Sequence, residues 1–71
     1  MTDRIVGDRI KEACKTKNIS RQEFAEKIGV DPTTIWRWFY GHIPNDSEKI
    51  IAIADVLDVS LDWLFGRTDA Q

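Results

Sequence analysis

The stretch from Ser20 to Gly41 constrains the fold more than any other part of the chain, because two helix starts follow one another across a short turn. The first start is a capping box, in which Ser20 is the N-cap and Glu23 stands three residues later. Ile19 and Phe24 occupy the two positions of a hydrophobic staple around the same start. This pattern predicts a sharply defined helix from Ser20 onward.

The second start comes almost at once. Gly29 can adopt the positive φ that ends the first helix. Asp31 is a favoured N-cap, and Pro32 suits the first helical position, where no N–H is needed. Gly41 is expected to close this second helix. Two helices joined by so short a turn cross steeply, at about 90–120°, rather than lying antiparallel.

The remaining sequence also has helical spacing of apolar residues, and no window keeps the alternation of a strand. A first helix is expected over 4–16, ended by a left-handed Asn18. A fourth begins at Asn45 or Asp46, with a capping box of Asn45 and Glu48, and runs to Leu57. A short fifth is capped by Ser60 and ended by Gly66. The prediction is an all-α domain spanning 1–71, with an ordered core of about 4–66 and a frayed tail.

Length and composition limit the class of protein. A chain of 71 residues buries only about 60% of its unfolded surface, so the core is small. It has no apolar run of the roughly 20 residues needed to span a bilayer and no apolar signal core. We therefore expect a soluble intracellular protein with no membrane partner. The single cysteine, Cys14, excludes an internal disulfide and a cysteine-based zinc site, and we expect an inert thiol.

Charge is unevenly distributed along the chain. Residues 1–43 hold eight basic and six acidic side chains, and residues 44–71 hold two and six, which together give the net charge of −2. The positive potential therefore lies in the half that contains the two closely spaced helices. Such an imbalance is consistent with a polyanionic partner, although small imbalances are common.

Catalytic and metal-binding patterns are weak. His42 is the only histidine, no nucleophile has a base at a recognisable spacing, and there is no phosphate-binding loop. Asp55, Asp58 and Asp62 fit a solvated acidic face better than a metal site, because the EF-hand pattern is absent. We expect no enzyme activity, no cofactor and no metal.

The central stretch matches a known pattern. Ala25, Gly29 and Ile35 fall where a helix-turn-helix motif has a small residue, a turn glycine and a core contact. The chain resembles the lambda-repressor/Cro-type helix-turn-helix family of phage and bacterial regulators over nearly its whole length. The segments "FYGHIPND" and "ADVLDVSLDWLFGR" are similar to the loop and C-terminal helices of such repressors. The resemblance implies a compact five-helix lambda-repressor-like domain that binds palindromic operators as a dimer and represses transcription in the bacterial cytoplasm or nucleoid.

The helix over 31–41 would then be the one that enters the major groove of double-stranded operator DNA. At 100° per residue, its buried side comprises Ile35, Trp38 and Phe39. The opposite side holds the candidates for contact with DNA bases, of which Arg37 is the strongest because a guanidinium can bond guanine O6 and N7 together. The base-contact candidates are Thr33, Thr34, Trp36 and Arg37.

Other residues are candidates for the DNA backbone. Arg21 matches a position where the family commonly has a glutamine against the backbone, and an arginine there can pair with phosphate. The Tyr40 hydroxyl can reach a phosphate, and His42 and Asn45 lie in the loop that matches a backbone-contacting segment. Trp63 and Phe65, in the fifth helix, are candidate dimer contacts, or else they only cover the core.

The chain also departs from the family pattern. Many members have a glutamate at position 39 that pairs with an arginine of the first helix, whereas here Phe39 faces Arg9, which is expected to turn to Glu23. Two aromatic residues near an exposed face also favour an alternative. This alternative is a protein-binding regulator on the same scaffold: an antitoxin, an antirepressor or the partner of a second regulator. For the DNA-binding hypothesis we expect a weak homodimer that tightens on DNA.

Overall fold

Five helices account for the regular structure of residues 2–69, the part of the protein that the computed structural model describes. They are α1 (Thr2–Thr16), α2 (Arg21–Ile28), α3 (Pro32–Phe39), α4 (Ser47–Leu57) and α5 (Leu61–Leu64). The expected all-α class is confirmed, although α1 begins at Thr2 rather than Arg4. None of the helices in this range has both the length and the apolar character of a membrane span.

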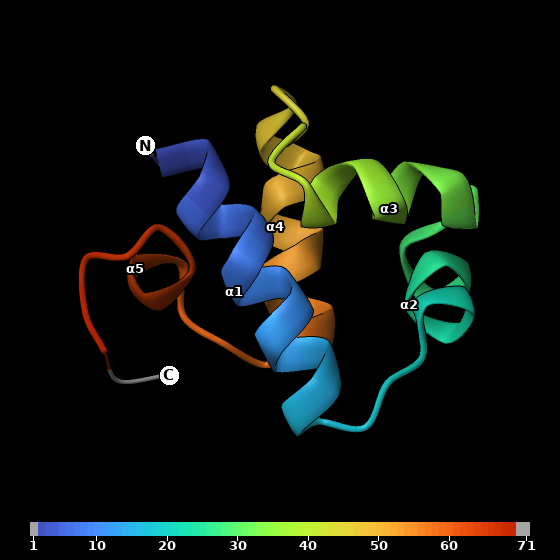
Figure 1. Ribbon diagram of the computed structural model, residues 1–71, viewed down its shortest axis with the longest axis horizontal. Coiled ribbons are helices and arrows are strands. Elements are labelled where there is room, and N and C mark those ends of the chain that lie inside the picture. The colour runs from blue at the N-terminus through green and yellow to red at the C-terminus, as the bar shows by residue number, and fades with distance from the viewer. Residues whose placement is uncertain (1, 70–71) are drawn as a thin grey trace.

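The helices are arranged around α1 and α4, which contact one another in the middle of the molecule. The α2–α3 pair lies on one side of this centre and α5 lies on the other, against α1 (Figure 1). α3 runs across the top of the pair in this view, and α2 is packed below its first turn. The central helices thus hold α2 and α3 in a fixed mutual orientation.

The core draws side chains from all five helices. Phe24 of α2, Ile35 of α3 and Leu64 of α5 are completely buried, and the Phe24 and Trp38 rings meet edge to face at 6.2 Å between centroids. The remaining buried core residues are Val6, Ile10, Ala13, Cys14, Ala25, Ile53, Ala54, Leu57, Val59 and Trp63. Burial raises the pKa of the Cys14 thiol to about 11, because the thiolate would lose its hydration.

Helix caps explain where most of these elements begin. Ser20 Oγ accepts the Glu23 N–H at 3.0 Å, and Ser60 Oγ accepts the Trp63 N–H at 3.1 Å, as the sequence predicts. The prediction for α4 is wrong in detail. Asp46, not Asn45, is the N-cap, and its carboxylate accepts the Glu48 N–H at 3.0 Å. Since asparagine and aspartate are about equally good caps, the local sequence does not distinguish the two neighbours.

Left-handed residues end several helices. Asn18 and Gly29 have φ values of 57° and 88°, as predicted. The Gly29 and Val30 N–H groups both donate to the carbonyl of Ala25, at 2.8 Å and 3.0 Å, so the turn out of α2 closes on itself. α3 ends at Phe39 with Tyr40 as its C-cap, and Gly41 follows in a left-handed conformation with a φ of 99°, so Gly41 closes this helix as predicted.

Gly7 allows an unusually close approach of two elements. An added Cβ at this position of α1 would lie 2.5 Å from the Trp38 carbonyl oxygen, 3.0 Å from the Gly41 nitrogen and 3.1 Å from the Phe39 carbonyl oxygen. All three neighbours are backbone atoms at the end of α3. α1 therefore supports the C-terminal end of α3 through direct backbone contact, which a residue with a side chain would prevent.

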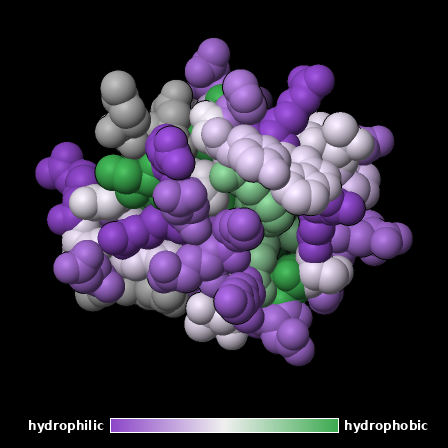
Figure 2. Space-filling view, viewed as in Figure 1, coloured by the Kyte–Doolittle hydropathy of each residue, from purple (hydrophilic) through white to green (hydrophobic). Residues whose placement is uncertain are grey.

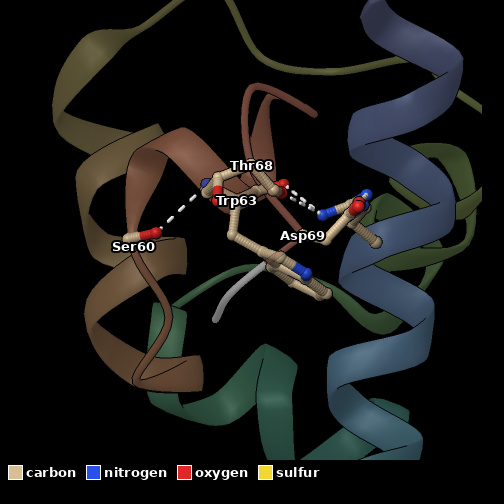
Figure 3. Close-up of polar contacts among 5 residues, drawn as sticks. Ser60, Trp63, Thr68 and Asp69 are labelled. Carbon is tan, nitrogen blue, oxygen red and sulfur yellow. Dashed lines mark hydrogen bonds and ion pairs between the residues drawn. The ribbon is translucent and has the colours of Figure 1, made fainter.

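Arg9 ties α1 to the other end of the chain. Its Nη1 donates to the carbonyls of Trp63, at 3.0 Å, and Thr68, at 2.9 Å, and its Nη2 lies 3.3 Å from the Asp69 carboxylate. Figure 3 shows Thr68 and Asp69 folded back beside Trp63 and next to α1. Two expectations are therefore corrected. Arg9 does not turn to Glu23, and the tail is held as far as Asp69, while residues 70–71 lie outside the described range.

Candidate nucleic-acid interface

The start of α3 is fixed by Asp31. Its carboxylate accepts the Thr33 N–H at 2.8 Å and also a hydrogen bond from the Thr33 hydroxyl, and both bonds hold the pKa of Asp31 below its ordinary value. The hydroxyl and the methyl group of this exposed side chain can meet a ligand.

The inner side of α3 anchors it to the body of the protein. Ile35 is completely buried, Trp38 is 3% exposed, and Phe39 is partly buried against the core. This is the buried side that the helical period predicts. Because the anchor residues come from one side only, the opposite side of α3 is presented to solvent along its whole length.

The outer side of α3 places the predicted contact residues together. Thr33, Trp36, Arg37 and Tyr40 are all exposed, whereas Thr34 is partly buried and therefore less accessible. Figure 2 shows pale ring-shaped side chains lying over α3, with strongly hydrophilic side chains around them. The surface formed by Thr33, Trp36, Arg37 and Tyr40, here called the outer face of α3, combines a cation with two aromatic rings.

Arg37 is the uncompensated cation of this face. Among residues 4–69, whose side chains the structure describes, the ion pairs are those of Arg9 with Asp69 and Arg67 with Asp62, and neither involves Arg37. Arg37 and His42 line a shallow hollow of about 350 Å³, and the His42 N–H donates to the Arg37 carbonyl at 2.9 Å. The guanidinium therefore has no carboxylate partner in this range, and its donors can serve a partner outside the chain.

A stack of side chains links α2 to α3. The Arg21 guanidinium lies over the Trp36 ring, with 5.0 Å from Cζ to the centroid, and the Tyr40 ring stacks on Trp36 at 5.4 Å and 9°. Sequence analysis placed Arg21 and Trp36 in separate roles and missed this contact. The i, i+4 spacing of Trp36 and Tyr40 indicates that they can meet, but nothing local to the sequence brings Arg21 to them.

A second hollow lies where α1 meets the end of α3. It has a volume of about 290 Å³ and is lined by Arg4, Asp8, Lys11, Phe39 and Tyr40. Phe39 contributes a ring to this hollow and meets Trp36 edge to face at 6.4 Å between centroids. The hollow continues the outer face of α3 toward α1 through Tyr40.

The loop after α3 bears the other predicted backbone contacts. His42 and Asn45 are both exposed, so the structure leaves them accessible. Asp46, next to them, is also exposed, and its carboxylate is engaged as the cap of α4. Within residues 2–69 no cluster of three or more potential metal-ligating side chains is present.

The candidate dimer residues are less exposed than a contact surface requires. Trp63 is 2% exposed, because its ring packs in the core under the Arg9 guanidinium, which is 4.8 Å from the ring centroid. Trp63 therefore has almost no surface to give to a second subunit, and its role is to cover the core. Phe65 is partly buried against the same core.

Comparison with known proteins gives a family for this arrangement. A model of the helix-turn-helix family matches residues 10–64, which include α2, α3 and the turn between them. The chain belongs to the helix-turn-helix family. In the terms of this family, α2 and α3 are the two helices of the motif.

Two curated members of the family give a measure of the similarity. One is an HTH-type transcriptional regulator of Haemophilus influenzae, which is 43% identical over 42 residues, or 59% of this chain and 18% of the relative. The other is the HTH-type transcriptional regulator YqaE of Bacillus subtilis, which is 32% identical over 57 residues, or 80% of this chain and 49% of the relative. This chain therefore spans half or less of these relatives. No solved structure matches it significantly.

Proposed function

We propose that the protein is a sequence-specific regulator of transcription that binds double-stranded DNA by inserting α3 into the major groove. The observation that carries this proposal is the outer face of α3. Its cation, Arg37, has no ion pair within the described chain, while the inner side of the same helix is locked into the core by Ile35 and Trp38. A rigid helix that presents free donors on a convex surface is the element that a major groove admits.

The side chains of this face have separate roles in the proposal. Arg37 reads a guanine through O6 and N7, and Thr33 contacts a neighbouring base through its methyl group or oxygen lone pairs. Thr34, being partly buried, contributes little to base contact. Contacts to phosphates come from both ends of the motif and from the loop after α3, namely from Arg21, Tyr40, His42 and Asn45.

The family supports a regulatory role and argues against an enzyme. Both curated relatives are described as transcriptional regulators, and the family model covers the two motif helices. The finer assignment, a Cro- or repressor-type protein of a phage or prophage, rests on the resemblance of the loop and the C-terminal helices to those of phage repressors. In this role the protein binds as a weak homodimer that tightens on its operator.

One observation favours a second function on the same scaffold. Trp36 is 43% exposed and Tyr40 is 72% exposed, and tryptophan, tyrosine and arginine are the usual anchors of protein interfaces. A protein-binding regulator, such as an antitoxin, an antirepressor or the partner of a second regulator, would use this surface. DNA remains the preferred partner because Arg37 on this surface and Arg21 beside it have no carboxylate partner among the described side chains of residues 4–69.

The test is the selection of bound duplexes from a random DNA library, with affinity then measured against salt. Recovery of a two-fold symmetric site with half-sites about 10 bp apart, and a steep loss of affinity with salt, is the expected result. One isolated half-site would contradict the dimer but retain the DNA-binding role. No enrichment above random sequence would refute sequence-specific binding. The outer face of α3 would then be assigned to binding a protein partner.

The role of Arg37 can be tested on the selected site. Arg37→Ala should weaken binding by about 1–3 kcal/mol and relax the preference at one base pair, because it removes a bidentate base contact. Arg67→Ala is the matched control, since Arg67 is paired with Asp62 at the far side of the molecule. Competition with operators altered one pair at a time measures the preference. An equal loss on all sequences would remove Arg37 from base recognition.

A further inference from the structure

Trp36 lies between two side chains of its own chain. Arg21 of α2 is 5.0 Å from the centroid of the indole, and the Tyr40 ring is nearly parallel to it at 5.4 Å. Trp36 thus makes two ring contacts within its own chain and remains 43% exposed. A base or an aromatic ring of a partner that stacked on this indole would compete with Arg21 and Tyr40 for its surface.

The contact with Trp36 leaves N–H donors of the Arg21 guanidinium available to a ligand. The guanidinium has five N–H donors, and contact with one ring leaves donors that can bind other groups. None of them is taken by a carboxylate of residues 4–69, the range whose side chains the structure describes. The contact also restricts the rotation of a long side chain before any ligand arrives. A planar fork of free donors held in one place is the arrangement that binds a phosphate through two hydrogen bonds.

The position of the stack on α3 indicates which part of DNA it meets. At 100° per residue, Trp36 lies 60° from Thr33 and 100° from Arg37, on the side of α3 that contacts α2. When a helix lies in a major groove, the side opposite its anchor faces the bases and its flanks face the sugar–phosphate walls. Arg21 and Trp36 belong to such a flank, and Tyr40, at 40° from Trp36, connects this flank to the side that faces the bases.

We propose that Trp36 is a positioning residue that holds the Arg21 guanidinium against a backbone phosphate, and that Tyr40 in turn holds the indole. Trp36 then makes no base contact, in contrast to the sequence-based expectation. This inference rests on the proposed DNA-binding function only in that the ligand is a DNA phosphate, and it requires no particular operator sequence.

A double-mutant cycle tests the inference. Arg21→Ala, Trp36→Ala and the double variant are measured on the selected operator and on a 20-bp duplex of random sequence, each over a range of salt. Each single change should reduce the slope of log K against log salt by about one unit on both duplexes, since one phosphate contact is lost. The double variant should lose no more than either single variant, because both remove the same contact.

Two further variants separate positioning from general damage. Trp36→Phe keeps a ring under the guanidinium and should retain most of the slope, whereas Trp36→Leu should behave like Trp36→Ala. Lys27→Ala is the matched control, because Lys27 is an exposed cation of α2 with no ring contact. Since Trp36 is partly exposed, these variants should fold, and thermal melts establish this before binding is measured.

Additive losses in the cycle would overturn the inference, because they would show that Trp36 acts apart from Arg21. Replacement of operator thymines by uracil gives a second arm, since it deletes only the methyl group in the major groove. If Trp36→Ala abolishes a sensitivity to this replacement, Trp36 reads bases and the inference is wrong. If the wild-type protein bound the operator and the random duplex equally well, the proposed sequence-specific function would be refuted. The double-mutant cycle measured on the random duplex would still show whether Trp36 acts through Arg21.

Discussion

Substitution of Gly7 by alanine tests the contact that supports the end of α3. The new Cβ would lie 2.5 Å from the Trp38 carbonyl oxygen, where ordinary van der Waals contact begins at 3.4 Å. If the neighbouring atoms belonged to a side chain, that side chain could change its rotamer and relieve the clash. The three nearest atoms are backbone atoms, which cannot move in this way. α1 and the end of α3 must therefore separate by nearly the difference, which is close to 1 Å. A gap of that size forfeits about a quarter to a half of the dispersion energy of the atoms that face one another.

The expected magnitude combines two opposing effects. Overpacking of this kind costs about 1–3 kcal/mol, and the absence of a yielding side chain places Gly7→Ala toward the upper end. Alanine in place of a helical glycine raises the stability of the folded state by about 1 kcal/mol through its higher helix propensity. The net loss should be about 1–2 kcal/mol in the free energy of unfolding. For a domain of this size the melting temperature should fall by about 4–8 °C for each kcal/mol.

Urea denaturation followed by tryptophan fluorescence, together with thermal melts by circular dichroism, measures this loss. Glu12→Ala is the matched control, because Glu12 is an exposed residue of the same helix and its substitution should change stability by less than about 0.5 kcal/mol. A Gly7→Ala protein as stable as the wild type, or more stable, would show that only helix propensity acts at this position. The close backbone approach of α1 to α3 would then be refuted.

Three other predictions concern caps and titratable groups. Ser20→Ala should lower the free energy of unfolding by about 1 kcal/mol, because it removes the acceptor for the Glu23 N–H, whereas Ser47→Ala, at a serine that caps nothing, should have little effect in the same urea titration. The folded pKa of Asp31 lies below its ordinary value, so its contribution to stability is complete above that value and is lost as the pH falls through the folded pKa. Melting temperatures measured into acid should therefore fall less steeply for Asp31→Asn than for the wild type, and parallel curves would contradict the bond from Thr33. Cys14, with its pKa raised to about 11, should react with a thiol reagent at neutral pH far more slowly than a free cysteine and should regain normal reactivity in urea, and rapid labelling of the folded protein would show that the thiol is accessible.

The sequence predicts those parts of the fold that depend on near neighbours. The caps at Ser20, Asp31 and Ser60 and the left-handed Asn18 and Gly29 are visible within four residues of each helix end, and all are present in the structure. The buried side of α3 also follows from the helical period alone. Each of these features depends on φ, ψ and hydrogen bonds that the local chain determines.

The features that the sequence does not predict depend on distant segments. Within α1 alone, Gly7 only lowers the helix propensity. Its role is evident only when the end of α3 is seen to pack against it. Arg9 is expected to turn to Glu23, but its partners come from α5 and from the tail, which is expected to be frayed. The pairing of Arg21 with Trp36 requires the crossing of α2 and α3, and neither residue type specifies the other.

The same limit applies to the candidate site. The accessible side of α3 follows from angular arithmetic, so Thr33, Arg37 and Tyr40 could be nominated without coordinates. Which of the exposed side chains is free to bind and which is already engaged is a property of the folded chain. The contacts of Trp36 with Arg21 and Tyr40 are of this second kind.

The three tryptophans provide two optical signals that report on different events. Trp38 and Trp63 are 3% and 2% exposed, so their emission responds to disruption of the core. Trp36, on the surface and stacked with Tyr40, is the indole that a small aqueous quencher such as acrylamide can reach. Quenching that falls when DNA is added, without a change in the emission of the buried pair, would record occupation of the outer face of α3 in an unlabelled protein. Folding and ligand binding can thus be followed separately in a single fluorescence experiment.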